Sequence, residues 1–218
     1  MGFLSGLFGK KEAPKRQLDH PNKLNKGDMI SLDDSFALPI QLRGQQLRVE
    51  TVNTYEYKRK QFAEWVLKGH SNEAVFLSLD EDDETYLSLS IKVTRDQVEQ
   101  LFDLDEFANI FEEPGKAQLT THSLKGELAD LLDNWYADAY HQVSFSDLGY
   151  FHKLDYRGQK PPQDEEGERG EAFESYQLLS NDETKAIDIE VYEGGVTDVM
   201  LTLYRPLSDI RDYWPAEL

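Results

Sequence analysis

The sequence contains no cysteine among its 218 residues. Disulfide bonds, thiolate zinc sites and thiol nucleophiles are therefore excluded, and the composition suits a reducing cytoplasm. No apolar run approaches the roughly 18–20 residues that a membrane-spanning helix needs. Basic residues are scarce too, with 23 Lys and Arg against 42 Asp and Glu, which gives a net charge of −19. Because a nucleic-acid-binding surface has to be basic, we expect no nucleic-acid partner and favour cations or basic proteins instead.

A stretch of the first half of the chain recurs without gaps in the second half. Residues 73–98 match residues 185–210 at a constant offset of 112. The coinciding apolar positions are Val75/Ile187, Leu77/Ile189, Leu79/Val191, Leu87/Val199, Leu89/Leu201, Ile91/Leu203 and Val98/Ile210. Just upstream, at an offset of 111, Phe62, Trp65 and Leu67 fall on Phe173, Tyr176 and Leu178. A self-match of this kind indicates one supersecondary unit used twice, the alternative being chance alternation in two strand-rich segments.

The strand and helix patterns predict an α+β protein made mainly of antiparallel β-sheet. We expect two homologous β-meander repeats, each closed by a helix, related by a pseudo-twofold axis and packed on each other. The predicted divisions are a basic, apolar tip and linker (1–26), a first meander with helix (27–115), a connecting helix (116–139) and a second meander with helix (140–218). An apolar stripe over residues 124–139 predicts the connecting helix, and Pro206 is expected to open the last helix.

The first residues form the basic, apolar tip. Phe3, Leu4, Leu7 and Phe8 stand at helical spacing and are followed by Lys10 and Lys11. Residues 1–16 carry a net charge of +3, which leaves −22 for the rest of the chain. This pattern indicates an interfacial anchor, in which apolar side chains enter the headgroup boundary and lysines meet anionic lipid. The alternative is a frayed terminus.

Two other places could bind a ligand. The acidic run Asp80, Glu81, Asp82, Asp83 and Glu84 is either a solvated hairpin turn or a weak site for divalent or polyamine cations. Trp65 and Tyr176 occupy equivalent positions in the two repeats and are either core anchors or walls of a cleft between the repeats. We identify no catalytic residue, no cofactor-binding residue and no metal ligand, because no known motif for such chemistry is complete.

Residues 24–30 (LNKGDMI), the later Glu64-Trp65-Val66-Leu67 and the acidic hairpin resemble an uncharacterised bacterial domain-of-unknown-function family. Its members are the YjfK-like accessory proteins of membrane-stress operons, which are small, β-rich and encoded beside polyamine-synthesis genes. The resemblance covers mainly residues 24–95 and carries no catalytic residue over. It implies a non-enzymatic accessory role at a stressed membrane and adds weight to a polyamine ligand.

The sequence therefore predicts a cytoplasmic accessory or adaptor protein, either free or peripheral on the inner membrane, that meets an anionic membrane surface or a protein partner through its tip. The alternative is a small-molecule or cation (polyamine or divalent) binder, or an enzyme, that uses the cleft between the repeats. An enzyme should gather several titratable groups from both repeats around one pocket, whereas an adaptor should bury only apolar groups there.

Overall fold

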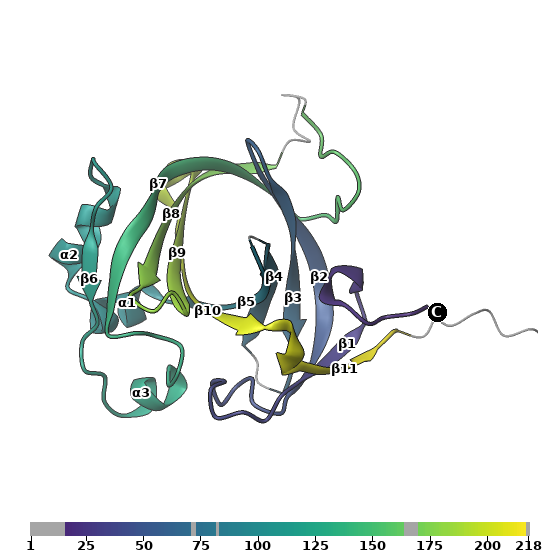
Figure 1. Cartoon of the computed structure of the whole chain (residues 1–218). Coiled ribbons are helices and arrows are strands. Elements are labelled where there is room, and N and C mark those ends of the chain that lie inside the picture. Colours follow the sequence, from purple (N-terminus) through teal and green to yellow (C-terminus); the bar gives the residue numbers. More distant parts are fainter. Residues whose placement is uncertain (1–15, 71–72, 82, 164–169, 217–218) are drawn as a thin grey trace, which may run out of the picture.

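The computed structural model describes residues 16–70, 73–81, 83–163 and 170–216 (Figure 1). The strands are β1 (Met29–Leu32), β2 (Gln46–Tyr57), β3 (Gln61–Lys68), β4 (Ala74–Glu81), β5 (Thr85–Val93), β6 (Gln118–Thr120), β7 (Ala139–His152), β8 (Glu171–Ser180), β9 (Lys185–Tyr192), β10 (Thr197–Pro206) and β11 (Ile210–Trp214). The helices are α1 (Arg95–Leu101), α2 (Leu104–Ala108) and α3 (Glu127–Leu131), with 3₁₀ turns η1 (Pro21–Lys23), η2 (Asn109–Phe111), η3 (Glu193–Gly195) and η4 (Leu207–Asp209). The prediction of a mainly antiparallel β protein with a few helices is confirmed.

Eight of the strands form a closed antiparallel ring, which Figure 1 shows end-on. Two four-stranded meanders, β2–β3–β4–β5 and β7–β8–β9–β10, lie edge to edge. One seam joins β5 to β10 from Tyr86↔Pro206 to Val93↔Val199, and the other joins β2 to β7 from Thr54↔His152 to Tyr57↔Gly149. Strands β1 and β11 extend the sheet beside β2, and β6 extends it beside β7. The meanders were expected to pack face to face, but pairing their edges gives every strand of the ring two hydrogen-bonded neighbours.

The strands of the ring direct their polar face inward and their apolar face outward. Successive side chains of a strand point to opposite faces, and alternate residues of all eight strands line a common internal cavity. On the other face, Leu77, Leu89 and Leu201 are fully buried within the apolar core. The main core therefore lies around the ring, and the space inside it is lined by polar and aromatic side chains.

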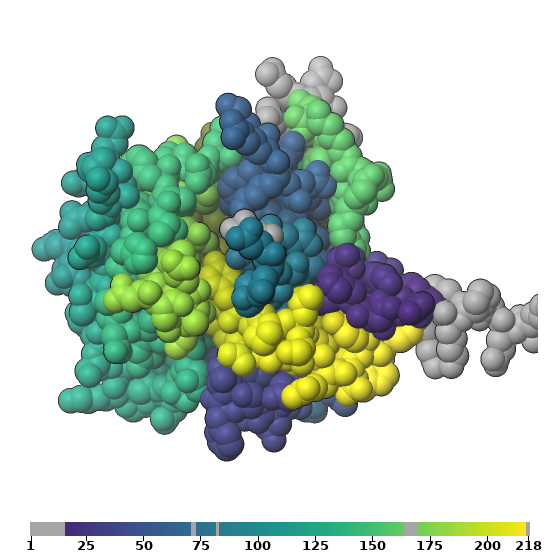
Figure 2. Space-filling model, in the orientation of Figure 1, coloured from purple at the N-terminus to yellow at the C-terminus, as the bar shows by residue number. Residues whose placement is uncertain are grey.

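Segments outside the ring cover this apolar face. Residues 17–45 bring Leu24, Leu38 and Leu42 into the core, and residues 95–138 bring in apolar side chains of α1, η2 and the segment around α3. The two covering segments meet where Trp135 Nε1 donates to Gln41 Oε1 at 3.2 Å. In the same orientation as Figure 1, the space-filling view shows residues of the second half of the chain (green and yellow) packed against residues of the first half (purple to teal) (Figure 2).

Two predicted helices are wrong. The expected closing helix from Pro206 is a single 3₁₀ turn, η4, followed by strand β11, because β1 has an edge that needs hydrogen-bond partners and Ile30 pairs with Tyr213 there. The expected connecting helix over 124–139 is confined to the five residues of α3. A capping box opens α1, where Thr94 and Gln97 exchange side-chain and backbone hydrogen bonds. Within the described ranges, none of the helices has the length and apolar character needed to cross a bilayer.

Replacing Gly149 with alanine tests the close packing of β7 against β8 beside the β2–β7 seam. Gly149 pairs with Tyr57 across the β2–β7 seam and with Phe173 on β8, and a Cβ at this position would overlap the Phe173 ring. We expect Gly149→Ala to lower the free energy of unfolding by about 1–3 kcal/mol, the usual cost of overpacking. The measurement is urea unfolding followed by circular dichroism.

Gly69→Ala is the matched control for this experiment. Its Cβ would meet the end of the Leu47 side chain 2.8 Å away, and a flexible side chain can move aside. A loss for Gly149→Ala no larger than the loss for Gly69→Ala would contradict the close packing at the seam.

Candidate functional site in the lumen of the ring

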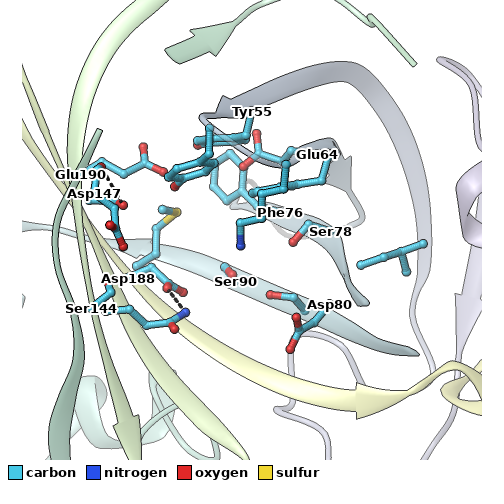
Figure 3. A pocket seen from close by; sticks show the side chains of 18 of the residues that line it. Tyr55, Glu64, Phe76, Ser78, Asp80, Ser90, Ser144, Asp147, Asp188 and Glu190 are labelled. Atoms are coloured by element: carbon cyan, nitrogen blue, oxygen red, sulfur yellow. Dashed lines mark hydrogen bonds between the residues drawn. The ribbon is translucent and has the colours of Figure 1, made fainter. Parts of the chain in front are cut away.

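The lumen contains a cavity of about 330 Å³ that is rich in carboxyl groups. Its acidic lining residues are Glu64, Asp80, Glu81, Asp147, Asp188 and Glu190, and its basic lining residue is Lys60. Figure 3 shows Glu190 and Asp147 on one side of this space and Glu64 and Phe76 on the other. These residues come from both meanders, so the first and second halves of the chain together build the site.

A second cavity of about 460 Å³ lies at the opposite ends of the same strands. The two cavities share Tyr55, Glu64 and Phe76, which form a central layer between them. The second cavity holds two ion pairs, Lys92 with Asp198 and Lys153 with Glu171. Its two lysines are thus already matched by carboxylates, whereas the first cavity has a clear excess of negative charge.

Two carboxyl groups and a phenol meet in the central layer. Tyr55 lines the same cavity as Glu64 on β3 and Glu190 on β9, and its hydroxyl lies near both carboxyl groups. Glu64 Oε1 also accepts a hydrogen bond of 2.9 Å from Asn53 Nδ2. Glu190 Oε2 accepts one of 2.6 Å from the Tyr192 hydroxyl. Both carboxyl side chains are buried, with only 6% and 5% of each residue exposed.

Asp188 is held by hydrogen-bond donors from the neighbouring strands. Its Oδ2 accepts from Thr202 Oγ1 at 2.6 Å and its Oδ1 accepts from Gln177 Nε2 at 2.8 Å. Thr202 lies 2.8 Å from the hydroxyl of Ser90 across the β5–β10 seam. The Asp188 carboxyl is therefore positioned by residues of three strands, and these donors are all uncharged.

Burial shifts the titration of the groups in the lumen. It raises the pKa of Glu64 to about 7, against the opposing hydrogen bond from Asn53. It also raises the pKa of Asp188 and of Glu190 above their usual range, although their hydrogen-bond donors act in the other direction. Burial and the negative charge of Glu64 and Glu190 raise the pKa of Tyr55 well above its ordinary value. A desolvated carboxylate without a paired cation is unfavourable, which is the common cause of these shifts.

The acidic run expected to bind cations is only partly at this site. Asp80 and Glu81 line the rim of the first cavity. Asp83 and Glu84 are exposed in the turn between β4 and β5, where Glu84 accepts a hydrogen bond of 2.8 Å from the Tyr86 hydroxyl. Asp82 lies outside the described residues.

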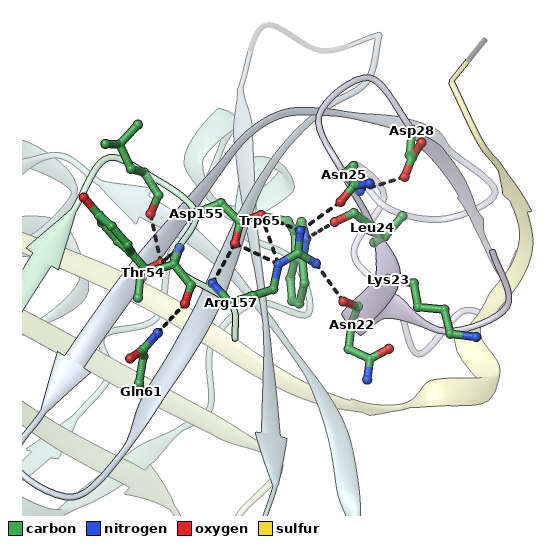
Figure 4. A network of polar contacts seen from close by, with 12 residues as sticks. Asn22, Lys23, Leu24, Asn25, Asp28, Thr54, Gln61, Trp65, Asp155 and Arg157 are labelled. Atoms are coloured by element: carbon green, nitrogen blue, oxygen red, sulfur yellow. Dashed lines mark hydrogen bonds and ion pairs between the residues drawn. The ribbon is translucent and has the colours of Figure 1, made fainter. Parts of the chain in front are cut away.

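Trp65 and Tyr176 are packed in separate places among the covering segments. Trp65 Nε1 donates to the Leu24 carbonyl oxygen at 2.9 Å, and the Arg157 guanidinium lies 5.4 Å from the Trp65 ring centre (Figure 4). Tyr176 packs edge-on against Phe111 and Phe145. Both side chains are buried, as core anchors would be, and Tyr176 also lines the first cavity, so both interpretations of this pair stay predictions.

Arg157 fastens the segment after β7 to the N-terminal part of the chain. It donates to the Asn22 carbonyl oxygen at 2.7 Å and to Asn25 Oδ1 at 3.0 Å, and it forms an ion pair with Asp155 (Figure 4). Its guanidinium therefore serves to hold these two segments together. The predicted tip residues Phe3, Leu4, Leu7, Phe8, Lys10 and Lys11 lie outside the described residues.

Glu64, Asp188 and Glu190 were not predicted as site residues from the sequence. The sequence does contain one indication of them, because these acidic residues stand in the middle of strongly apolar strands, as in FAEWV and IDIEV. The alternation of apolar and polar residues alone predicts that such acidic residues face solvent. They face the lumen because the sheet closes into a ring. Comparison of the chain with family models, with curated proteins and with solved structures found no significant match.

Replacing Glu64 with glutamine tests the burial of its carboxyl. A carboxyl whose pKa rises from 4.5 to about 7 on folding makes the protein less stable as pH rises through that interval. The glutamine side chain cannot ionise, so the stability of the variant does not fall for this reason as the pH rises. We therefore expect Glu64→Gln to gain about 2–3 kcal/mol over the wild type between pH 5 and pH 8. Urea unfolding at the two pH values measures the difference.

Asp130→Asn on the exposed surface of α3 is the control and should follow the wild type at both pH values. If Glu64→Gln also lost stability in parallel with the wild type, Glu64 would not be desolvated as described.

Proposed function

We propose that this chain is a binding protein that holds a small, extended organic cation of the polyamine class in the lumen of the ring. The carrying observation is the convergence of buried carboxyl groups from both meanders on one cavity whose lining holds six carboxyls and one lysine. Buried charges are normally paired, and this negative charge lacks a matching number of cationic side chains. A bound cation would supply the missing charge.

The chemistry of the lining supports an organic cation over a divalent metal. Within the described residues, no three His, Cys, Asp or Glu side chains come together in a group that could hold a metal ion. The carboxyls are instead distributed along the lumen, among the aromatic rings of Tyr55, Tyr57, Phe62 and Phe76. Aromatic faces attract ammonium groups, and carboxylates accept their hydrogen bonds.

The relation between the meanders supports a ligand with similar ends. We infer that the meanders are two copies of one unit related by a pseudo-twofold axis. Ser90 bonds Thr202, and these two positions differ by the same 112 residues that separate the repeated sequences. The pairing Trp65↔Leu77 in the first meander corresponds to Tyr176↔Ile189 in the second. An axis of this kind exchanges the two ends of the lumen, and a linear diamine or polyamine also carries an ammonium group at each end.

The two copies have diverged at their last hairpin. Leu77 pairs with Leu89, whereas the equivalent Ile189 pairs with Val199, a register that differs by two residues. A shift of two residues keeps every side chain on its original face, so the inward polar face survives the change.

Thermal denaturation with a panel of cations tests the proposal. We expect spermidine or putrescine at about one hundred times its dissociation constant to raise the melting temperature by about 5–10 °C. Mg²⁺, Ca²⁺ and an uncharged glycol of similar length should give no comparable shift. Asp188→Asn should weaken binding by roughly tenfold or more, because it removes a buried carboxylate partner.

The matched control is Asp130→Asn, which removes an exposed carboxyl far from the lumen in the fold and should bind as the wild type does. If only Mg²⁺ or Ca²⁺ stabilised the protein, the ligand would be a divalent metal and not an organic cation. Equal loss in both variants would indicate non-specific attraction to the net charge.

The role of the tip stays a separate prediction. If residues 1–16 anchor the protein on anionic lipid, deleting residues 2–12 should abolish co-sedimentation with anionic vesicles and leave the melting temperature unchanged. Binding of the full-length protein should weaken sharply between low and moderate salt, because attraction to the headgroups is screened over about 10 Å at 0.1 M. Equally negligible pelleting of both proteins would contradict a membrane-associated accessory role.

A further inference from the structure

The central layer places two acidic groups close together without a cation of their own. Glu64 and Glu190 line the same cavity as Tyr55. The positive charge of Lys92 acts on Glu64, but its ammonium group is paired with Asp198. If both carboxyls were ionised in the empty lumen, two negative charges would share a desolvated space.

The remaining groups that face this layer are mostly acidic or neutral. The charged and titratable side chains that line the two cavities around it are Tyr55 and Tyr57 from β2, Lys60 from the β2–β3 turn, Asp80 and Glu81 from β4, Lys92 from β5, Asp147 from β7, Lys153 just after β7, Glu171 and Tyr176 from β8, Asp188, Glu190 and Tyr192 from β9, Glu193 from η3, and Asp198 and Tyr204 from β10. The tyrosines are neutral at physiological pH, because burial raises their pKa values further. The surroundings therefore add more negative charge than positive charge.

We propose that the empty lumen holds a proton on the Glu64 carboxyl and that a bound ammonium group displaces it. In the empty state at neutral pH, the proton occupies Glu64 in about half of the molecules. When the cation enters, Glu64 loses its proton to solvent, and the resulting carboxylate accepts a hydrogen bond from the ammonium group. One positive charge enters the layer as another leaves, so the net charge of the desolvated space is conserved.

Two observations favour Glu64 as the group that exchanges the proton. It lines both cavities, so a ligand in either cavity can reach it. Its carboxyl is buried, and the donor held to it is neutral, since the Asn53 amide donates to Oε1 at 2.9 Å. A pKa near 7 makes the exchange responsive within the physiological range.

This inference rests on the proposed function and predicts that affinity depends on pH. Raising the pH from 6.0 to 7.5 should tighten spermidine binding by about five- to tenfold, because the proton no longer competes. The amines of spermidine stay almost fully charged over this interval, so the change reports on the protein. Glu64→Gln mimics the neutral acid at every pH and should bind with an affinity that changes much less.

Isothermal titration calorimetry of the full chain with spermidine at pH 7.0 measures the proton directly. Titrations in phosphate and in imidazole buffer differ by the heat of buffer protonation. The wild type should release about half a proton, since a group with a pKa near 7 is half protonated at this pH. Glu64→Gln should bind without release. Asp147→Asn, at the exposed rim, should bind more weakly but release the same fraction of a proton.

The outcomes separate the two proposals. Wild-type binding with equal heats in both buffers overturns the proton exchange and leaves the binding function standing. Unchanged proton release in Glu64→Gln overturns the assignment to Glu64. No binding by the wild type overturns the function itself. The pH dependence of wild-type affinity needs no variant and tests the exchange even if a substitution disturbs folding.

Discussion

The hydrogen-bonded seam between β2 and β7 is the constraint on which the rest of this structure depends. Without it, the two meanders would form one open sheet with a polar face toward water. The four residue pairs of the seam close that sheet into a ring, and closure turns the polar face inward. The apolar face is then left on the outside, where the segments before β2 and between β5 and β7 cover it.

This arrangement gives the buried carboxyls an unusual status. Most buried acidic groups are paired with Arg or Lys, because a desolvated charge costs several kcal/mol. Asp188, Glu64 and Glu190 are held by hydroxyl and amide donors instead. Neutral donors stabilise a carboxylate less than a cation does, which is why their pKa values remain raised. Such a cluster is poised to accept either protons or an external cation.

The local structure was predictable from the sequence to a large extent. The repeated segments 73–98 and 185–210 contain the strands Thr85–Val93 and Lys185–Tyr192, as their alternating apolar residues indicate, and Thr94 and Gln97 form a capping box at the start of α1. These features are set by side-chain alternation and by backbone hydrogen bonding over a few residues. The C-terminal segment shows where local signals fail. Pro206 suits a helix start, but pairing between Ile30 and Tyr213, far apart in the sequence, determines the outcome.

The candidate site could not be predicted from the sequence, because it too depends on pairing between strands far apart in the sequence. Glu64 lies between Ala63 and Trp65, and both of these neighbours are buried against the covering segments. The repeat predicted that the meanders were alike, but it gave no information on whether they met by faces or by edges. Faces in contact would have buried the leucines between two sheets and left the carboxyls in water. Edges in contact bury both sets, on opposite sides of the same ring.

A crystal structure of the protein grown with spermine tests the central claim most directly. We expect electron density for an extended ligand inside the ring, passing the Tyr55–Glu64–Glu190 cluster and approaching Asp188. Density confined to the outer surface, with only water between these carboxyls, would contradict cation binding in the lumen.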